Sequence, residues 1–299
     1  MTAAARVADP SVSVGAALRA ASRRLADAGM ETPDLDARLL VGHALGRDWS
    51  GLIRERDRPV SHGDLAEIAA LVARREACEP VAYIVGSKEF WGLDFQVDRS
   101  VLVPRPDSET LVELTLELVR ASDRHCTDQG LSLLDLGTGS GCLLLSLLAE
   151  LPGARGIGVD RSHAAIEVAR QNAARLGMSA RCTFVVGDWA NGLQGSFDVV
   201  VFNPPYIASD DIECLADDVC RYEPRSALDG GVDGLACYRK ISRDAARLVK
   251  PGGFLICEIG AGQAERVREI VFDGKELMFL YGRQDLAQTV RCLAGQKPD

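Results

Sequence analysis

The chain of 299 residues lacks several features that would assign it to a specialised class. Its nine cysteines include no Cys-x-x-Cys pair, which argues against a disulfide framework and a zinc site, so we expect no metal. No apolar run reaches the roughly 18 residues that a membrane span needs. Met1 to Val14 lack the basic start and apolar core of a signal peptide. We therefore expect a protein of the reducing cytoplasm, with no membrane partner.

A surplus of positive charge is also lacking. The chain has 34 lysines and arginines against 43 aspartates and glutamates, a net charge of -9. A phosphate backbone would be repelled at long range, so composition predicts no direct nucleic-acid partner. Arg54, Arg56 and Arg58 form a local basic group, but Glu55 and Asp57 alternate with them, which is more typical of a solvated turn of mixed charge.

Apolar residues at three-to-four spacing dominate the first eighty residues and predict helices only. Three helices are expected, over residues 17–28, 32–46 and 61–72, and Gly29 and Gly46 end the first two. Residues 1–80 should thus form a small helical domain. Residues 81–106 then change to short β-like stretches, in which Phe90 to Phe95 suggest a hairpin that turns at or near Gly92. This segment is the predicted linker.

The rest of the chain, from about residue 107, predicts an α/β domain. A helix over 108–119 and a polar surface loop over 122–130 come first. Strand-like and helical runs then alternate, which indicates a parallel sheet with helices on both faces. The seven expected strands cover residues 131–136, 156–160, 182–186, 197–202, 254–259, 277–281 and 289–293. The last two have no helix between them, so they should pair as an antiparallel hairpin.

A glycine-rich turn, Asp-Leu-Gly-Thr-Gly-Ser-Gly over residues 135–141, closes the first of these strands. Glycines let the backbone approach a ligand closely, and free N–H groups at the start of the next helix face it. Dinucleotide-binding folds use a similar turn, and a purely structural turn is the other alternative. The candidates for cofactor binding in this turn are Gly137, Thr138, Gly139, Ser140 and Gly141.

Two further strands end in residues suited to an adenosine. Asp160 follows the turn by about 20 residues, where its carboxylate can accept both ribose hydroxyls, although it could instead cap the next helix. Asp188 could bind the adenine amino group and Trp189 could cover the ring; the alternative is a turn with a packing indole. Because three strands end in such residues on one edge, we favour cofactor binding. No proton relay for hydride transfer is evident, which favours methyl transfer.

The segment Asn203, Pro204, Pro205 and Tyr206 ends the fourth strand. An amide nitrogen is a poor nucleophile because its lone pair is shared with the carbonyl group. The Asn203 side-chain oxygen and the Pro204 carbonyl can accept the two hydrogens of an NH2 group, and Tyr206 offers a flat face for stacking. These acceptors would stabilise the positive charge that develops during methyl transfer, so we predict this segment as catalytic. A Pro-Pro turn that merely ends a strand is the alternative.

These motifs resemble those of class I amino-methyltransferases, and most closely the peptide chain release factor glutamine methyltransferases, the PrmC/HemK family. Residues 79–86, 89–93, 103–109 and 223–231 also resemble blocks of that family, so the resemblance spans nearly the whole chain. Ser108 stands where the family usually has threonine, which keeps the hydroxyl group. Residues 281–289 lack the usual glycine and arginine after Asp-Leu-Ala, so any partner contact of that hairpin could differ.

The resemblance implies a Rossmann-like methyltransferase domain with a seven-stranded sheet behind the helical domain. It implies that S-adenosylmethionine contacts the glycine turn, Asp160, Trp189 and Asn203, and that Asn203 to Tyr206 hold a glutamine. The substrate would be the Gly-Gly-Gln loop of bacterial class 1 release factors, methylated on the side-chain nitrogen, with the helical domain helping to dock that protein. Ribosomal-protein glutamine methyltransferases, adenine-N6 methyltransferases and a non-catalytic adaptor are the alternatives.

Overall fold

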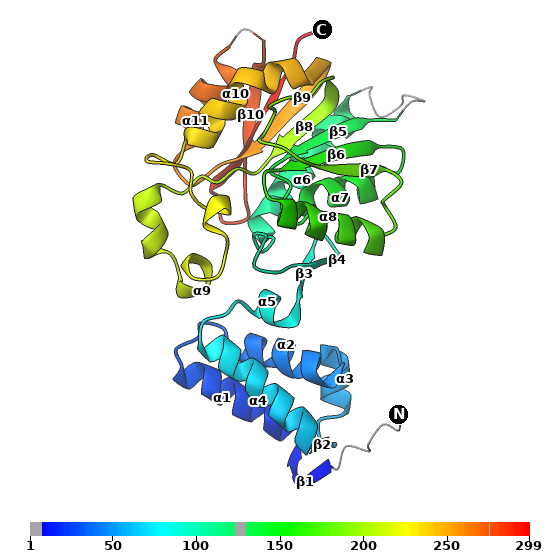
Figure 1. The fold of residues 1–299 in the computed structure, drawn as a ribbon, viewed down its shortest axis with the longest axis vertical. Helices are drawn as coiled ribbons and strands as arrows, with labels where there is room; N and C mark the ends of the chain where they lie inside the picture. The colour runs from blue at the N-terminus through cyan, green and yellow to red at the C-terminus, as the bar shows by residue number, and fades with distance from the viewer. Residues whose placement is uncertain (1–7, 123–129, 275) are drawn as a thin grey trace. The chain divides into compact units, whose positions relative to one another are not determined.

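The computed structural model describes residues 8–122, 130–274 and 276–299, so most of the loop expected at 122–130 lies outside the described residues. The chain divides into two compact units (Figure 1). The first contains residues up to Gly86 together with Asp217–Tyr222; the second contains Ser87–Ala216 and Glu223–Asp299. Among the described helices, none has both the length and the apolar character that crossing a membrane requires.

Helices that pack around one apolar core build the first unit. Its long helices are α1 (Val14–Asp27), α2 (Pro33–Leu45) and α4 (His62–Glu76), which confirms the three that periodicity predicts. The Ser61 hydroxyl caps α4 by accepting from the Asp64 N–H, and Gly46 ends α2 in the left-handed conformation. The buried face of α1 carries Leu25, which is fully buried against α2 and α4 residues.

Two features of this unit differ from the expectation of helices only. Strands β1 (Ala8–Ser13) and β2 (Pro59–Ser61) pair antiparallel, and short helices α3 (Trp49–Arg54) and α5 (Val81–Val85) are added. A three-residue strand is too short to show a period. The β-branched residues of α5 favour a strand by sequence. In the structure the segment is a helix that buries Tyr83 and Ile84 and ends at Gly86 in the left-handed conformation.

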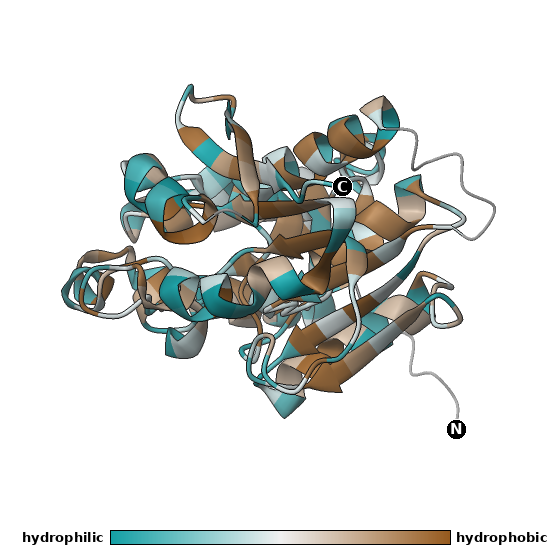
Figure 2. Cartoon of the chain, turned by 90° about the horizontal axis from the view of Figure 1, so that it is seen from above, coloured by the Kyte–Doolittle hydropathy of each residue, from teal (hydrophilic) through white to brown (hydrophobic). Residues whose placement is uncertain are grey.

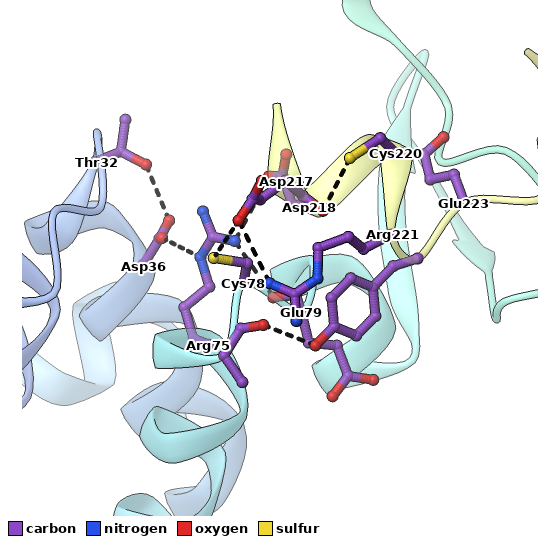
Figure 3. Close-up of polar contacts among 12 residues, drawn as sticks. Thr32, Asp36, Arg75, Cys78, Glu79, Asp217, Asp218, Cys220, Arg221 and Glu223 are labelled. Atoms are coloured by element: carbon purple, nitrogen blue, oxygen red, sulfur yellow. Dashed lines mark hydrogen bonds and ion pairs between the residues drawn. The ribbon is translucent and has the colours of Figure 1, made fainter. Parts of the chain in front are cut away.

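A polar cluster joins Asp217–Tyr222 to the helices of the first unit (Figure 3). The Arg75 guanidinium of α4 donates to Asp36 of α2 at 2.8 Å and pairs with Asp218 of α9 (Asp217–Cys220) at 3.5 Å. The Tyr222 hydroxyl donates to the backbone oxygen of Ala77 at 2.7 Å. A six-residue segment that lies far along the chain is therefore part of this helical unit.

The second unit begins with the hairpin of β3 (Ser87–Phe90) and β4 (Leu93–Gln96). Its turn lies at Trp91 and Gly92, both with positive φ, which confirms the predicted hairpin and its turn. The single turn η1 (Pro106–Ser108) then leads into α6 (Glu109–Ala121), close to the predicted helix over 108–119.

A seven-stranded sheet forms the centre of the described part of this unit, in the order β10-β11-β9-β8-β5-β6-β7. The strands from β5 to β9 run parallel, and β11 is antiparallel to both of its neighbours. The final hairpin is thus confirmed. The strands are β5 (Ser132–Leu136), β6 (Arg155–Asp160), β7 (Cys182–Val186), β8 (Phe197–Phe202), β9 (Val249–Glu258), β10 (Met278–Gln284) and β11 (Val290–Gln296).

Helices cover both faces of this sheet, as predicted (Figure 1). Helices α6, α7 (Cys142–Glu150) and α8 (His163–Arg175) share one apolar core with the strands, whereas α10 (Ala236–Leu248) and α11 (Ala264–Phe272) share the other. Every residue of β8 is buried, as expected for a strand covered on both faces, and Figure 2 shows the strands of the sheet largely in brown. The strand order reverses between β5 and β8, which places a crevice at their carboxyl ends.

Candidate active site

A cavity lies at the carboxyl ends of the central strands, the edge at which open α/β sheets bind their ligands. The loops after β5, β6, β7 and β8 all contribute to its walls, as the strand-end argument predicts. Most of the predicted site residues line it: Gly137, Thr138, Gly139, Ser140, Asp160, Asp188, Trp189, Asn203 and Pro205. The predicted residues Gly141, Pro204 and Tyr206 lie beside the cavity rather than on its wall.

The glycine turn contributes shape more than free hydrogen-bond donors. The N–H groups of Gly137 and Thr138 both donate to the Val159 carbonyl, and the Thr138 hydroxyl donates to Asp135 at 2.6 Å. Gly137 has φ +77°, and a Cβ added there would meet the Trp189 ring at 3.0 Å. A side chain at position 137 would therefore be strained and would push the indole out of place.

Asp135 lies under this turn and was not among the predicted site residues. Its side chain is fully buried. Burial raises the pKa of Asp135 to about 7, the Thr138 hydroxyl lowers it, and the charge of Asp160 raises it further. Asp135 therefore binds its proton more tightly than an exposed aspartate does.

Asp160 connects the glycine turn to the start of α8. One carboxylate oxygen accepts from the Gly139 N–H at 3.0 Å, and the other accepts from the Ser162 N–H at 2.9 Å. The cap of α8 is Ser162, whose hydroxyl accepts from the Ala165 N–H. Asp160 is thus free of the capping role, and each of its oxygens keeps acceptor capacity toward the cavity that it lines.

The loop after β7 brings a carboxylate and an indole to the same cavity. Asp188 forms an ion pair with Lys240 of α10, a partner that the sequence did not reveal. Trp189 adopts φ 56°, which is unfavourable for a residue with a side chain. Its ring packs over Gly137, and this packing holds the strained backbone in place.

The Asn203 carboxamide stands at the end of β8, on the cavity wall. Its Nδ2 donates to the Ser108 hydroxyl at 3.1 Å, which leaves the oxygen as the available end of the amide. The Tyr206 hydroxyl donates to Glu258 at 3.2 Å. Burial and the charge of Glu258 raise the pKa of Tyr206 far above its usual range, so this phenol stays protonated.

Two other residues at this end of the sheet were missed at the sequence level. Glu258 ends β9 and is 1% exposed, and Gln263 precedes α11. The Gln263 side chain accepts from the Gly260 N–H at 3.1 Å and donates to the Tyr206 carbonyl at 2.9 Å, so it fixes the backbone that follows the Pro-Pro pair. An acid at a strand end, the signal that revealed Asp160, was also present at Glu258.

Comparisons with known proteins agree with this geometry. A methyltransferase domain model matches residues 127–293, and a PrmC N-terminal domain model matches residues 16–86. A release factor glutamine methyltransferase of Bradyrhizobium diazoefficiens is 43% identical over 294 residues, which cover 98% of each chain. The chain belongs to the release factor glutamine methyltransferase family.

Other relatives of this methyltransferase support the same assignment. The release factor glutamine methyltransferase of Rhodospirillum rubrum is 43% identical over 274 residues, which cover 92% of this chain and 82% of the relative. A crystal structure of a methyltransferase from Pyrococcus furiosus superposes with a TM-score of 0.50 at 18% identity, covering 77% of this chain and 98% of that one. This second likeness confirms the Rossmann-like methyltransferase fold.

The residues that line the cavity suit S-adenosylmethionine, the cofactor of this class of enzyme. Asp160 and Asp188 both line it, where the predicted roles are to accept from the ribose hydroxyls and from the adenine amino group. Leu102, Val159 and the Trp189 ring provide apolar walls for a purine. Carboxylates that accept from hydroxyl and amino groups, beside apolar walls for a ring, are the acceptors and surfaces that suit an adenosine.

Replacing Asp160 with alanine is expected to raise the dissociation constant of S-adenosylmethionine by about tenfold or more. The two ribose hydroxyls of the bound cofactor would lose their charged acceptor. Isothermal titration calorimetry measures this constant directly. Asp273→Ala, at an exposed position after α11, is the matched control and should bind as the parent does. An unchanged constant in the Asp160 variant would rule out the ribose assignment.

Proposed function

We propose that this enzyme methylates the side-chain nitrogen of the glutamine in the Gly-Gly-Gln loop of bacterial class 1 release factors, in the cytoplasm. The observation that carries the proposal is the Asn203 carboxamide, which is held through its nitrogen and lines the cofactor cavity. Its free oxygen suits one hydrogen of a substrate NH2 group. Relatives named for this activity, with matching length, support the choice of substrate.

The residues after β8 would hold the substrate amide. When bound, S-adenosylmethionine supplies a methyl group activated by the positive sulfonium sulfur. The Asn203 side-chain oxygen and the Pro204 carbonyl would accept hydrogen bonds from the two N–H groups of the glutamine side chain. This would orient the nitrogen lone pair toward the cavity. As the N–CH3 bond would form and the S–CH3 bond break, with its electron pair left on sulfur, positive charge would grow on that nitrogen, so both acceptors bind the transition state more strongly than the ground state. One of the two N–H protons would then be lost to solvent.

One assay tests this proposal against its alternatives. The enzyme is incubated with labelled S-adenosylmethionine and, in parallel, with a purified release factor, ribosomal proteins and DNA. We expect label only on the release factor, and mass spectrometry should place it on the glutamine of the Gly-Gly-Gln sequence. Label on a ribosomal protein or on adenine alone would replace the proposed substrate.

We further propose that the helical unit docks the substrate protein through a groove bounded by α1, α2 and α3. Four arginines line this groove, and the exposed side chains of Trp49 and Ile53 give it an apolar side. Arg38 stacks on the Trp49 ring at 4.3 Å. The groove has four arginines against one acidic residue, Asp34, in a chain whose net charge is -9, so its positive lining is suited to an acidic segment of the release factor. The arginines are Arg19, Arg23, Arg38 and Arg56.

Reversing the charge of two groove arginines, Arg19→Glu together with Arg23→Glu, should raise the KM for the release factor by about tenfold and weaken its salt dependence. The dissociation constant of S-adenosylmethionine should not change. The matched control is Arg155→Glu with Arg243→Glu, which alters the same charge at exposed positions of the second unit. Equal KM values for the two double variants would exclude the groove as the docking site.

A further inference from the structure

The Pro204 carbonyl, one of the two acceptors in the activity proposed above, belongs to a stretch of backbone that cannot anchor itself. Pro204 and Pro205 have no N–H group, so neither can hold its place by donating a hydrogen bond. On one side the chain is anchored, because Phe202 ends β8 and pairs with both neighbouring strands. The direction of the Pro204 carbonyl then depends on what holds the chain on the other side, from Tyr206 onward.

Tyr206 is held at its side chain and at its backbone by residues that end or follow β9. Its hydroxyl donates to Glu258 Oε1 at 3.2 Å. Its carbonyl accepts from Gln263 Nε2 at 2.9 Å, and Gln263 Oε1 accepts from the Gly260 N–H at 3.1 Å. The Gln263 side chain is thus itself fixed at both ends of its amide. The short segment from Glu258 to Gln263 therefore holds Tyr206 at two separate points.

Gly260 adds a third contact, for which a glycine is needed. Its φ is not positive, so the backbone conformation does not require glycine, but the available space does. A Cβ at this position would lie 2.9 Å from Gln263 Oε1 and 3.1 Å from Cδ2 of the Tyr206 ring. The distance to the ring carbon is well below the optimal separation of two carbon atoms. A side chain at position 260 would therefore displace the Tyr206 ring, the Gln263 amide or both.

A second glycine-containing loop packs against the same backbone. A Cβ at Gly230 would lie 2.8 Å from the Pro205 carbonyl oxygen, and a Cβ at Gly234 would lie 2.4 Å from the Tyr206 carbonyl oxygen. The Gly230 N–H also donates to the carbonyl of Ile207 at 2.8 Å. A shift of the chain over residues 205–207 would break these contacts, so the position of Tyr206 is determined from two loops.

We infer that Glu258, Gly260 and Gln263 are positioning residues that act through Tyr206 to keep the Pro204 carbonyl directed at the substrate amide; this inference rests on the proposed function. Strand β8 fixes the chain before the two prolines, and these three residues fix it after them. Because the proline rings also lock φ at both positions, the carbonyl between the two anchors keeps little freedom. Displacing Tyr206 would therefore turn this acceptor away from the nitrogen that it should bind.

Two substitutions in the full-length enzyme test this role. Gly260→Ala should lower kcat for the release factor by about tenfold to 100-fold, the usual effect of a small misplacement of a group that positions the substrate. Gln263→Glu keeps the acceptor for the Gly260 N–H but loses the donor to Tyr206, so it should lower kcat in the same way. The dissociation constant of S-adenosylmethionine should change little, because the described lining of the cofactor cavity includes neither residue. The KM for the release factor should also change little, because the docking surface is intact.

The matched control is Gly153→Ala, an exposed glycine of the same unit. A Cβ at Gly153 would meet no described atom within 4 Å, so this variant should keep the parent kcat. A Gly260→Ala variant that also keeps the parent kcat would overturn the inference.

A double-mutant cycle separates positioning from general damage to the fold. In a Tyr206→Ala background the ring is absent, so adding Gly260→Ala should lower kcat by a clearly smaller factor than it does in the parent. A structural defect that does not act through Tyr206 would lower kcat by the same factor in both backgrounds. That additive result would contradict the positioning role.

A further measurement does not depend on activity. The chain has five tyrosines, and with 3-fluorotyrosine in their place the fluorine signal of Tyr206 can be assigned by its loss in Tyr206→Phe. We expect this signal to shift in Gly260→Ala and to keep the parent position in Gly153→Ala. A signal that does not move in Gly260→Ala would refute the contact on which the inference depends. If the signal moves as expected while the parent transfers no methyl group to release factors, only the proposed function fails.

Discussion

Replacing Asn203 with alanine is expected to lower kcat for the release factor by about 100-fold to 1000-fold, the usual effect of removing a group aimed at charge that develops in the transition state. The change removes the side-chain acceptor at the end of β8 and leaves the Pro204 carbonyl in place. The dissociation constant of S-adenosylmethionine should change much less, because most of the cavity wall remains. Single-turnover kinetics with saturating cofactor, together with calorimetry, separate the two effects.

Asn191→Ala is the matched control for this experiment. Asn191 is an exposed asparagine of the same unit, in the loop after β7, and its loss should leave kcat near the parent value. An Asn203→Ala variant with the activity of the parent would refute the catalytic assignment of residues 203–206. A large loss of cofactor affinity with unchanged kcat would instead make Asn203 a binding residue only.

Replacing Arg75 with methionine is expected to destabilise the helical unit by about 3–5 kcal/mol, the effect of leaving one member of a buried ion pair without its partner. The side chains of Arg75 and Asp36 are only 11% and 6% exposed. Without Arg75, Asp36 keeps only the hydrogen bond from the Thr32 hydroxyl at 3.0 Å (Figure 3). Native-state hydrogen exchange of the amides of α2 and α4 measures the opening free energy of this unit.

An exposed ion pair between helices of the same unit provides the control. Arg24 and Glu76 pair at 2.6 Å, with side chains 43% and 29% exposed, so Arg24→Met should cost about 0–1 kcal/mol. Adding Asp36→Leu to the Arg75→Met variant should recover much of the lost stability, because the buried carboxylate that lost its partner is then gone. Equal losses for the two single variants would show that burial does not set the strength of these pairs.

Local patterns were sufficient to predict the sheet and its helices. Each strand from β5 to β8 is a short apolar run that ends next to a turn residue, and such runs are recognisable without a structure. The same applies to the site, because parallel strands end on one edge and bring Asp160, Trp189 and Asn203 to one cavity. The relatives then confirm the enzyme family.

Features that depend on distant parts of the chain could not be predicted in this way. The Ser108–Asn203 contact joins residues 95 positions apart, and no local period reports it. Strand β1 pairs with β2 across about half of the helical unit, and the three residues of β2 are too few to show a period. The Arg75–Asp218 pair spans 143 positions, and only the folded chain shows that α9 belongs with the helices.

The membership of Asp217–Tyr222 in the helical unit limits how this chain can be recombined with its relatives. The polypeptide enters and leaves that unit in the middle of its catalytic sequence, so it changes units after Gly86, after Ala216 and after Tyr222. Consider a hybrid that takes its first 86 residues from a relative and the rest from this chain. Its helices would come from one parent and α9 from the other, so Asp218 and Tyr222 would meet partners from a different parent. Compatible chimaeras therefore need at least two exchanged blocks, which favours inheritance of the two units together.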